Sequence, residues 1–171
     1  MTHRAYIGLG ANLPSPAGSP EQTLPSAIDE LAGAGRLAAL SHLYRTEPVG
    51  PVSQPPFVNA VAQLDTDLEP EPLLDFLLAI ERRYRRDRTL DPPKGPRTLD
   101  LDLLLVDNLI LRTERLTLPH PGLAERRFVL APLAEIAPDL RIPGLEVSVQ
   151  DLLEALPDAG PNRRRAVRRI G

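Results

Sequence analysis

The sequence contains no cysteine, and only 4% of its 171 residues are aromatic. The absence of cysteine excludes disulfide bonds, thiolate catalysis and cysteine-based metal sites. The three histidines, His3, His42 and His120, are not spaced as the histidine pair of a zinc site would be. The few aromatic side chains disfavour a surface that stacks the bases of single-stranded nucleic acid.

Long hydrophobic runs are also missing from the chain. No apolar segment approaches the ~20 residues that span a bilayer, and residues 1–5 lack the hydrophobic region of a signal peptide. We therefore expect a cytoplasmic protein without a membrane partner. Apolar residues make up 42% and charged residues 25% of the chain, a balance typical of a globular domain with a hydrophobic core. We expect a monomer.

Lysine is almost absent, because Lys94 is the only one and arginine supplies nearly all of the positive charge. A net charge of −3 disfavours wholesale binding of nucleic acid. One group of basic residues lies within 82–97, where both a solvated helix end and a phosphate clamp are compatible with the pattern. A second group lies within 163–169. We expect residues 1–156 to form the domain and residues 157–171 to form a flexible arginine-rich tail, or else a weak contact for a polyanion.

Hydrophobic periodicity predicts a chain that mixes helices and strands. The expected elements, in order, are a strand at 5–10, a helix from about residue 20, strands at 37–46 and 57–66, a helix at 69–84, a strand that ends at Val106, a hairpin through Asp107 and Asn108 to residues 109–111, and helices at 128–136 and 148–156. This order predicts the α+β class, with a ferredoxin-like βαββαβ core, an antiparallel sheet with packed helices, and an added hairpin.

The most informative segment is Gly95–Val106, which places Asp100 and Asp102 two residues apart in an apolar strand. Side chains two positions apart in a strand share a face, so the two carboxylates lie side by side. Ionised carboxylates at the wall of a core repel each other and resist the loss of water. Mg²⁺ is commonly held by one or two carboxylates together with substrate phosphates and would relieve both effects. A solvated strand edge is the alternative.

The acidic pair and the arginines that precede it together favour phosphoryl or pyrophosphoryl transfer. Metal ions bridge phosphate oxygens in such reactions, and guanidinium groups neutralise charge on the transferred group. Because cysteine is absent and no serine has an obvious histidine–acid partner, we expect direct in-line transfer without a covalent intermediate. Two other classes stay open: a metal-dependent nucleotidyltransferase, and a non-enzymatic nucleic-acid-binding module on a ferredoxin-like sheet.

The segment Gly95–Asp102 resembles the signature of the 6-hydroxymethyl-7,8-dihydropterin pyrophosphokinase family of folate biosynthesis. The resemblance covers residues 4–156. It implies that the hydroxymethyl oxygen of the reduced pterin attacks the β-phosphorus of ATP and that AMP leaves. The similarity continues in the order expected of the family through Tyr6–Leu13, Tyr44–Gly50, Gln54–Ala60, Ile80–Glu81, Arg86–Arg88, Arg115–His120 and Arg126–Leu130.

On the phosphate side, the resemblance implies that Asp100 and Asp102 hold two Mg²⁺ ions. It also implies that Arg86 and Arg97 are catalytic residues that stabilise charge on the transferred group. The arginine loop at 86–96 would close as a lid over the triphosphate and exclude water. The residues that would contact ATP are Glu81, Arg88, Arg115, Thr117, His120 and Arg126.

On the pterin side, the resemblance implies that the ring stacks between Phe57 and Phe128. Asn59 would bind the edge of the heterocycle, which accounts for a polar side chain within a strand. ATP and the pterin are therefore the expected small-molecule partners, with no nucleic acid. The remaining pterin contacts would come from the end of the preceding strand, namely Thr46, Pro48, Val49 and Gly50.

Overall fold

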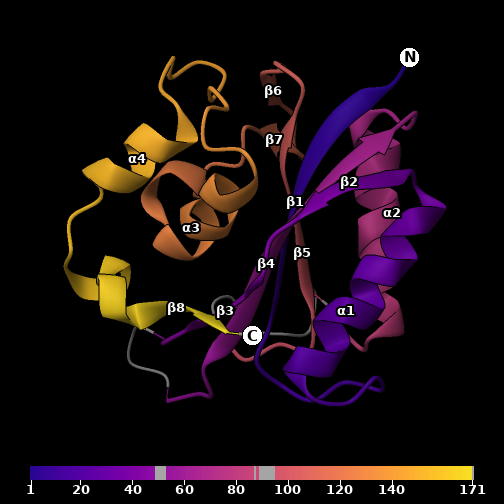
Figure 1. Cartoon of the computed structure of the whole chain (residues 1–171). Helices are drawn as coiled ribbons and strands as arrows, with labels where there is room; N and C mark the ends of the chain where they lie inside the picture. The colour runs from indigo at the N-terminus through magenta and orange to yellow at the C-terminus, as the bar shows by residue number, and fades with distance from the viewer. Residues whose placement is uncertain (49–52, 87, 89–94, 171) are drawn as a thin grey trace.

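The computed structural model describes residues 1–48, 53–86, 88 and 95–170. The chain forms a sheet with helices on both sides (Figure 1). None of the helices in these ranges is long and apolar enough to cross a membrane. In chain order the elements are β1 (His3–Ala11), α1 (Pro20–Glu30), η1 (Leu31–Gly33), β2 (Arg36–Leu40), β3 (Leu43–Thr46), β4 (Phe57–Thr66), α2 (Pro70–Arg83), β5 (Asp100–Val106), β6 (Leu111–Arg112), β7 (Thr117–Leu118), η2 (Leu123–Glu125), α3 (Arg127–Ile136), α4 (Val149–Ala155), η3 (Gly160–Asn162), η4 (Arg164–Ala166) and β8 (Val167–Ile170), where η marks a 3₁₀ helix.

An antiparallel sheet forms the centre of the molecule, with the strand order β5-β1-β4-β3-β8. β2 also pairs with β4, next to β3. Gly10 on β1 lies opposite both Asn59 on β4 and Asp100 on β5, and Gly8 lies opposite Asp102. Directly paired residues share a face of an antiparallel sheet, so Asp100, Gly10 and Asn59 form one row across three strands.

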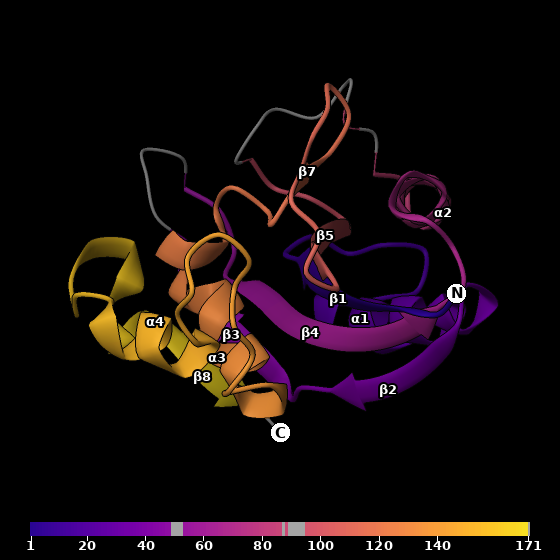
Figure 2. The same ribbon diagram turned by 90° about the horizontal axis from the view of Figure 1, so that it is seen from above.

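Helices cover both faces of this sheet (Figure 1, Figure 2). α1 and α2 lie on one face, where their apolar side chains, such as Leu24 and Leu73, join the larger hydrophobic core. α3 and α4 lie on the other face, where Leu104 and Leu130 belong to a second core. A strand that is covered on both faces needs apolar side chains at successive positions, which explains the continuous run Leu103–Val106.

Local signals set the boundaries of the two helices on the first face. α1 begins at Pro20, as predicted, and the side-chain oxygen of Gln22 accepts the N–H of Ser19 at 2.9 Å. Proline suits the first helical position because its φ is already helical and its missing N–H would have no helical partner. α2 carries an acid in its first turn and arginines in its last turn, which complements the helix dipole.

The strand expected at 37–46 is two strands, β2 and β3, separated by Ser41 and His42. The Ser41 hydroxyl accepts the N–H of Val61 at 2.9 Å, and the Ser41 N–H donates to the Val61 carbonyl at 2.9 Å. The N–H of His42 donates to the carboxylate of Glu135 on α3 at 3.1 Å. The Ser41 hydroxyl and the Glu135 carboxylate thus take part in the backbone bonding at this point, where one strand ends and the next begins.

The hairpin expected through Asp107 and Asn108 is wrong in its pairing, because β6 pairs with β7 and not with β5. The turn after β5 is bound to β1. The N–H of Asp107 donates to the Arg4 carbonyl at 2.9 Å, and the Asp107 carboxylate accepts the Arg4 N–H at 2.8 Å and contacts His3 at 2.6 Å. These bonds hold the turn against β1, and the next hairpin forms further along the chain.

The C-terminal residues differ from the flexible tail expected at 157–171. Val167–Ile170 form β8, which pairs with β3 at the edge of the sheet. Ala166 and Val167 are only 2% and 9% exposed, whereas Arg168 and Arg169 face solvent. The buried residues Ala166 and Val167 therefore pack this segment against the sheet. The many arginines around them make this short apolar pattern hard to recognise in the sequence.

Candidate active site

The aspartates of β5 lie on one face of the sheet, as the strand pattern predicts. The side chains of Asp100 and Asp102 keep 16% and 26% of their surface exposed. The residues opposite them on β1 are Gly10 and Gly8, so the neighbouring strand places no side chain beside the carboxylates. The backbone of β1 therefore lies directly beside the acidic pair.

Arg88 links the acidic pair to a third carboxylate. Its guanidinium forms two hydrogen bonds with Glu81, at 2.9 and 2.7 Å. The same group lies 2.8 Å from Asp100 Oδ1 and 3.4 Å from Asp102 Oδ1. These contacts, with the bonds to Glu81 foremost, raise the pKa of Arg88 and keep it charged. The family resemblance assigned all of these residues to one site, and the structure places the side chains of Glu81, Arg88, Asp100 and Asp102 in contact.

Glu81 is the buried end of this cluster. It lies on the core-facing side of α2 and is 1% exposed. One of its oxygens accepts the N–H of Leu101 at 2.6 Å, which fastens α2 to the edge of β5. Burial raises the pKa of Glu81, and the bonds from Arg88 oppose that rise. The ion pair therefore compensates for a carboxylate that would otherwise be costly to bury.

The electrostatics of the acidic pair favour an added cation. Burial raises the pKa of Asp102 above its usual value, and repulsion from Asp100 adds to the effect. Burial lowers the pKa of nearby His120, although the charge of Asp102 acts in the opposite direction. His120 Nδ1 accepts the N–H of Gly122 at 3.1 Å, so its neutral form carries the proton on Nε2.

Arg97 lies between the acidic pair and Phe57. Its Nη1 lies 3.0 Å from Asp100 Oδ2, and its guanidinium lies 5.6 Å from the centre of the Phe57 ring. Its backbone N–H donates to Asn12 Oδ1 at 2.8 Å. The amide nitrogen of Asn12, a residue only 3% exposed, donates to Gln54 Oε1 at 2.9 Å and to the Pro55 carbonyl at 3.0 Å.

Asn12 is thus a residue of the site that the sequence reasoning did not single out. The sequence signals for it are a short polar side chain directly after an apolar strand and its place in the segment Tyr6–Leu13 that resembles the family. Its partners lie far away along the chain, so their identity requires the fold.

Asn59 lies across Gly10 from the acidic pair. It is 7% exposed, and its Oδ1 has no hydrogen-bond partner among the described residues. The buried hydroxyl of Thr46, on the adjacent β3, is also without a partner there. A Cβ added at Gly10 would come within 2.7 Å of Asn59 Nδ2. The glycine therefore makes room for the amide, and the unpaired oxygens suit a polar ligand.

The two phenylalanines expected to stack the pterin lie in different elements. Phe57 begins β4, opposite Thr46 of β3. Phe128 lies in the first turn of α3, with the guanidinium of Arg126 5.8 Å from the centre of its ring. Pro48 is described and half-buried, whereas Val49 and Gly50, which were also expected to contact the pterin, lie outside the described residues.

Of the other residues expected to bind ATP, His120 and Arg126 lie close enough to the acidic pair to interact electrostatically with it or with each other, whereas Arg115 and Thr117 lie elsewhere. Arg115 is exposed and paired with Asp75, and Thr117 lies in β7 opposite Arg112. His120 is fixed to β5 by its N–H, which donates to the Leu104 carbonyl at 2.8 Å. Arg86, expected to be catalytic, is 6% exposed, and its N–H donates to the Glu81 carbonyl at 3.0 Å. Most of the expected lid, residues 87 and 89–94, lies outside the described residues.

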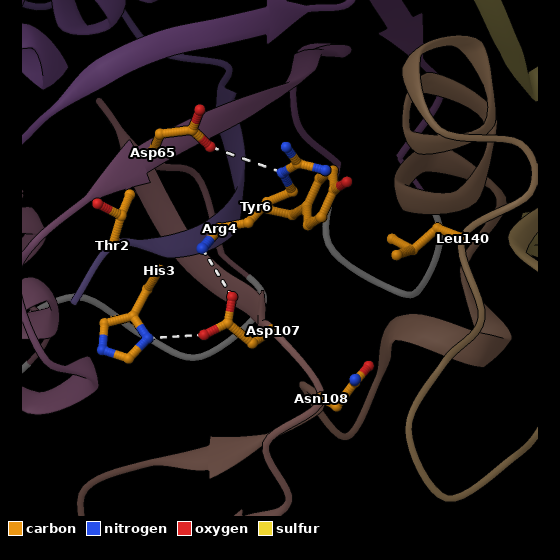
Figure 3. Close-up of a pocket in the computed structure, with 8 residues that line it drawn as sticks. All are labelled: Thr2, His3, Arg4, Tyr6, Asp65, Asp107, Asn108 and Leu140. Atoms are coloured by element: carbon orange, nitrogen blue, oxygen red, sulfur yellow. Dashed lines mark hydrogen bonds and ion pairs between the residues drawn. The ribbon is translucent and has the colours of Figure 1, made fainter.

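The opposite end of β1 and β5 has a different character (Figure 3). A pocket of about 390 Å³ there is lined by Thr2, His3, Arg4, Tyr6, Asp65, Asp107, Asn108 and Leu140. His3, which is 7% exposed, bridges Asp107 at 2.6 Å and Glu69 at 3.0 Å. The charged groups in this pocket are thus already paired with one another, which distinguishes it from the end that carries unpaired amide and hydroxyl oxygens.

Comparison with known proteins identifies the class of the chain. A family model described as 7,8-dihydro-6-hydroxymethylpterin-pyrophosphokinase (HPPK) matches residues 6–138. The chain belongs to this family. It is accordingly an enzyme, an ATP-dependent pyrophosphokinase of folate biosynthesis.

Individual relatives match over nearly their whole length. The chain is 46% identical to a 2-amino-4-hydroxy-6-hydroxymethyldihydropteridine pyrophosphokinase of Pseudomonas aeruginosa over 165 residues, which cover 95% of this chain and 98% of the relative. It is 43% identical to the protein of the same name from Haemophilus influenzae over 154 residues, which cover 90% of this chain and 93% of the relative.

Solved structures share the fold. Plasmodium falciparum HPPK-DHPS with pterin and p-hydroxybenzoate matches with a TM-score of 0.74 over 99% of this chain, at 14% identity. The wild-type protein with pteroate gives the same TM-score at 13% identity. The chain spans 47% and 46% of the length of these two structures.

Proposed function

We propose that this enzyme transfers diphosphate from ATP to the hydroxymethyl group of 6-hydroxymethyl-7,8-dihydropterin and releases AMP. One observation carries the proposal: Asp100, Gly10 and Asn59 form a single row across β5, β1 and β4. The row has carboxylates for a metal–phosphate group at one end and an unpaired amide oxygen for a heterocycle at the other. The names of the Pseudomonas and Haemophilus relatives agree with such a substrate.

The carboxylates are suited to Mg²⁺. Among the described residues, no group of three or more histidine, aspartate or glutamate side chains is arranged to hold a metal. Two carboxylates together with phosphate oxygens are a usual environment for Mg²⁺. A cation beside Asp102 would also favour its ionised form and so oppose the rise in its pKa. We propose that Asp100 and Asp102 would hold two Mg²⁺ ions, which would supply positive charge that neutralises the phosphate groups during transfer.

The arginines complete the phosphate side of the proposal. Arg97 already lies beside Asp100. Its planar guanidinium would bind the oxygens of the transferred group and neutralise their charge. Arg86 would act in the same way. Arg88, Arg115, Thr117, His120 and Arg126 would bind ATP, with Glu81 acting through Arg88. A cation held by the aspartates would compete with Arg88 for their oxygens and free its guanidinium for phosphate.

The pterin side of the proposal rests on the unpaired polar atoms. Asn59 and Thr46 would hydrogen-bond the edge of the ring, and Phe57 and Phe128 would contact its faces. Pro48, Val49 and Gly50 would complete the wall. In-line attack then requires only that the hydroxymethyl group point along the row from Asn59 towards Asp100.

We also propose that β1, α1, the β2–β3 pair, β4, α2 and β5 form a ferredoxin-like core. The central order β5-β1-β4 with β2 and β3 beyond β4 supports this arrangement. The remaining elements would be additions to that core.

The test is to incubate the protein with ATP, Mg²⁺ and 6-hydroxymethyl-7,8-dihydropterin and to identify the nucleotide product by chromatography. We expect AMP and no pyrophosphate. ADP would indicate transfer of a single phosphate, and free pyrophosphate would indicate nucleotidyl transfer. Either product, or no turnover by the folded protein, would overturn the proposal.

A further inference from the structure

The C-terminal segment Gly160–Ile170 contacts two of the chain segments that carry pterin-side residues. β8 pairs with β3 so that Val167 lies opposite Thr46. Directly beyond that pair, the N–H of Glu47 donates to the Ala166 carbonyl at 2.8 Å. The backbone that leads from Thr46 to Pro48 is therefore held by the C-terminal segment. Figure 1 shows β8 beside β3, with α3 adjacent to both.

Asn162 holds the second of these segments, which carries Arg126 and Phe128. Its Oδ1 accepts the N–H of Arg127 at 3.0 Å, and its Nδ2 donates to the Glu125 carbonyl at 2.8 Å. Its backbone carbonyl accepts from Arg127 Nε at 2.7 Å. One residue thus makes contacts on both sides of Arg126, in the turn that leads into Phe128.

These bonds replace a cap that α3 does not provide for itself. Arg126 stands at the N-cap position with no side-chain capping bond. The first N–H groups of a helix lack helical partners, so Asn162 Oδ1 caps α3 from a distant part of the chain.

The buried side chain of Arg127 makes a further contact between α3 and the C-terminal segment, through the Asn162 carbonyl. Its side chain lies at the N-terminus of α3, where the helix dipole disfavours a cation. It is only 8% exposed, and burial, with the charge of Arg164, lowers its pKa. Its Nη2 has no hydrogen-bond partner among the described residues. The carbonyl of Asn162 therefore partly offsets an unfavourable burial and ties α3 to the C-terminal segment.

We infer that Asn162 is a positioning residue of the active site. It fixes the direction of the first turn of α3, and thereby the places of Arg126 and Phe128, while Ala166 and Val167 fix Thr46 and Pro48 on the other wall. The inference rests on the proposed function for the roles of those four residues. Asn162 itself touches neither substrate.

The test compares Asn162→Ala, Asn162→Asp and Arg165→Ala, the last an exposed control on the same segment. Loss of two side-chain hydrogen bonds should raise KM for the pterin about 10-fold in Asn162→Ala and lower kcat by a smaller factor. Asn162→Asp keeps the acceptor for Arg127 but loses the donor to the Glu125 carbonyl, and should raise KM by about 2- to 3-fold. The control should equal the parent protein.

Direct titration separates positioning from general stability. The pterin dissociation constant, measured by pterin fluorescence with a non-hydrolysable ATP analogue, should rise with KM in Asn162→Ala. A lower Tm with unchanged KM and dissociation constant would overturn the inference, as would an aspartate variant as impaired as alanine. If Asn162→Ala does not fold, the aspartate variant decides alone: its KM must exceed that of Arg165→Ala. A parent protein that neither binds the pterin nor releases AMP refutes the proposed function, whereas an active parent with unaffected variants refutes only this inference.

Discussion

At the scale of single residues, one guanidinium, that of Arg88, is shared by the three carboxylates of Glu81, Asp100 and Asp102. The two bonds from Arg88 to Glu81 make a buried carboxylate tolerable and fix the arginine in place. The remaining contacts shield the repulsion between Asp100 and Asp102. A cation that replaces Arg88 at the aspartates therefore enters a place already prepared for positive charge.

Glu81→Gln should destabilise the protein. The amide keeps the shape of the side chain but loses the charge that compensates Arg88, so we expect the free energy of unfolding to fall by about 1–3 kcal/mol. Urea denaturation measures this change. Glu71→Gln, at an exposed position of the same helix, is the control, and equal midpoints for the two variants would contradict the role given to Glu81.

Asp100→Ala should abolish turnover and leave pterin binding nearly intact. In the proposed mechanism this carboxylate holds a cation that neutralises phosphate charge, so we expect the rate of AMP formation to fall by more than about 1000-fold. Fluorescence titration of the pterin should change little. Asp151→Ala, which removes an exposed carboxylate on α4, is the control. A rate for Asp100→Ala close to that of this control would return the acidic pair to a solvated strand edge.

Gly10→Ala should weaken pterin binding selectively. The new Cβ would lie 2.7 Å from Asn59 Nδ2 and displace the amide, so we expect the pterin dissociation constant to rise about 10-fold. Gly8→Ala is a matched control, because its Cβ would meet Leu104 at an ordinary 3.5 Å. Equal dissociation constants for the two variants would show that Gly10 does not make room for Asn59.

At the scale of elements, the sequence predicts what neighbouring residues encode. β4 spans Phe57–Thr66 as expected, and α1 begins at Pro20 because its start signals are local. The pairing predicted after β5 is wrong because the observed turn depends on bonds from Asp107 to His3 and Arg4, which are remote in sequence. β8 was missed for the same reason, since its partner β3 lies far earlier in the chain.

The candidate site shows the same division. Strand periodicity alone predicts that Asp100 and Asp102 share a face, and the family resemblance supplies the other residues. Neither predicts that Gly10 separates Asp100 from Asn59, because that row depends on the register of three strands. The link from Asn12 to Arg97 and Gln54 likewise exists only once the loops have been brought together.

His3 connects three elements at the other end of the sheet and makes their packing sensitive to pH. Hydrogen bonds to Glu69 and to Asp107 raise its pKa above the ordinary value of 6.5, although burial acts against them. The folded protein therefore holds this proton more tightly than the unfolded chain. The stabilisation is complete below about pH 6.5 and is lost as the pH rises through the higher folded-state pKa.

His3→Gln should remove this pH dependence. We expect the parent protein to exceed the variant in unfolding free energy most clearly near pH 6, with the difference shrinking towards pH 9. Urea denaturation of both proteins at several pH values measures it. A difference that is constant with pH would show that protonation of His3 does not contribute.

At the scale of the whole molecule, the two ends of the sheet differ in how their charged and polar groups are paired. One end pairs its charges internally through His3, Arg4 and their carboxylate partners. The other end gathers carboxylates, guanidinium groups, aromatic rings and unpaired polar oxygens from both helical layers. The C-terminal segment links β3, through β8, to the start of α3, through Asn162.

The most direct test of this account is one reaction in which both products are quantified. With ATP, Mg²⁺ and 6-hydroxymethyl-7,8-dihydropterin, mass spectrometry should show AMP and a pterin carrying two added phosphates, in equal amounts. The account predicts that both disappear together in Asp100→Ala. A pterin carrying a single phosphate, or AMP formed without modified pterin, would contradict it.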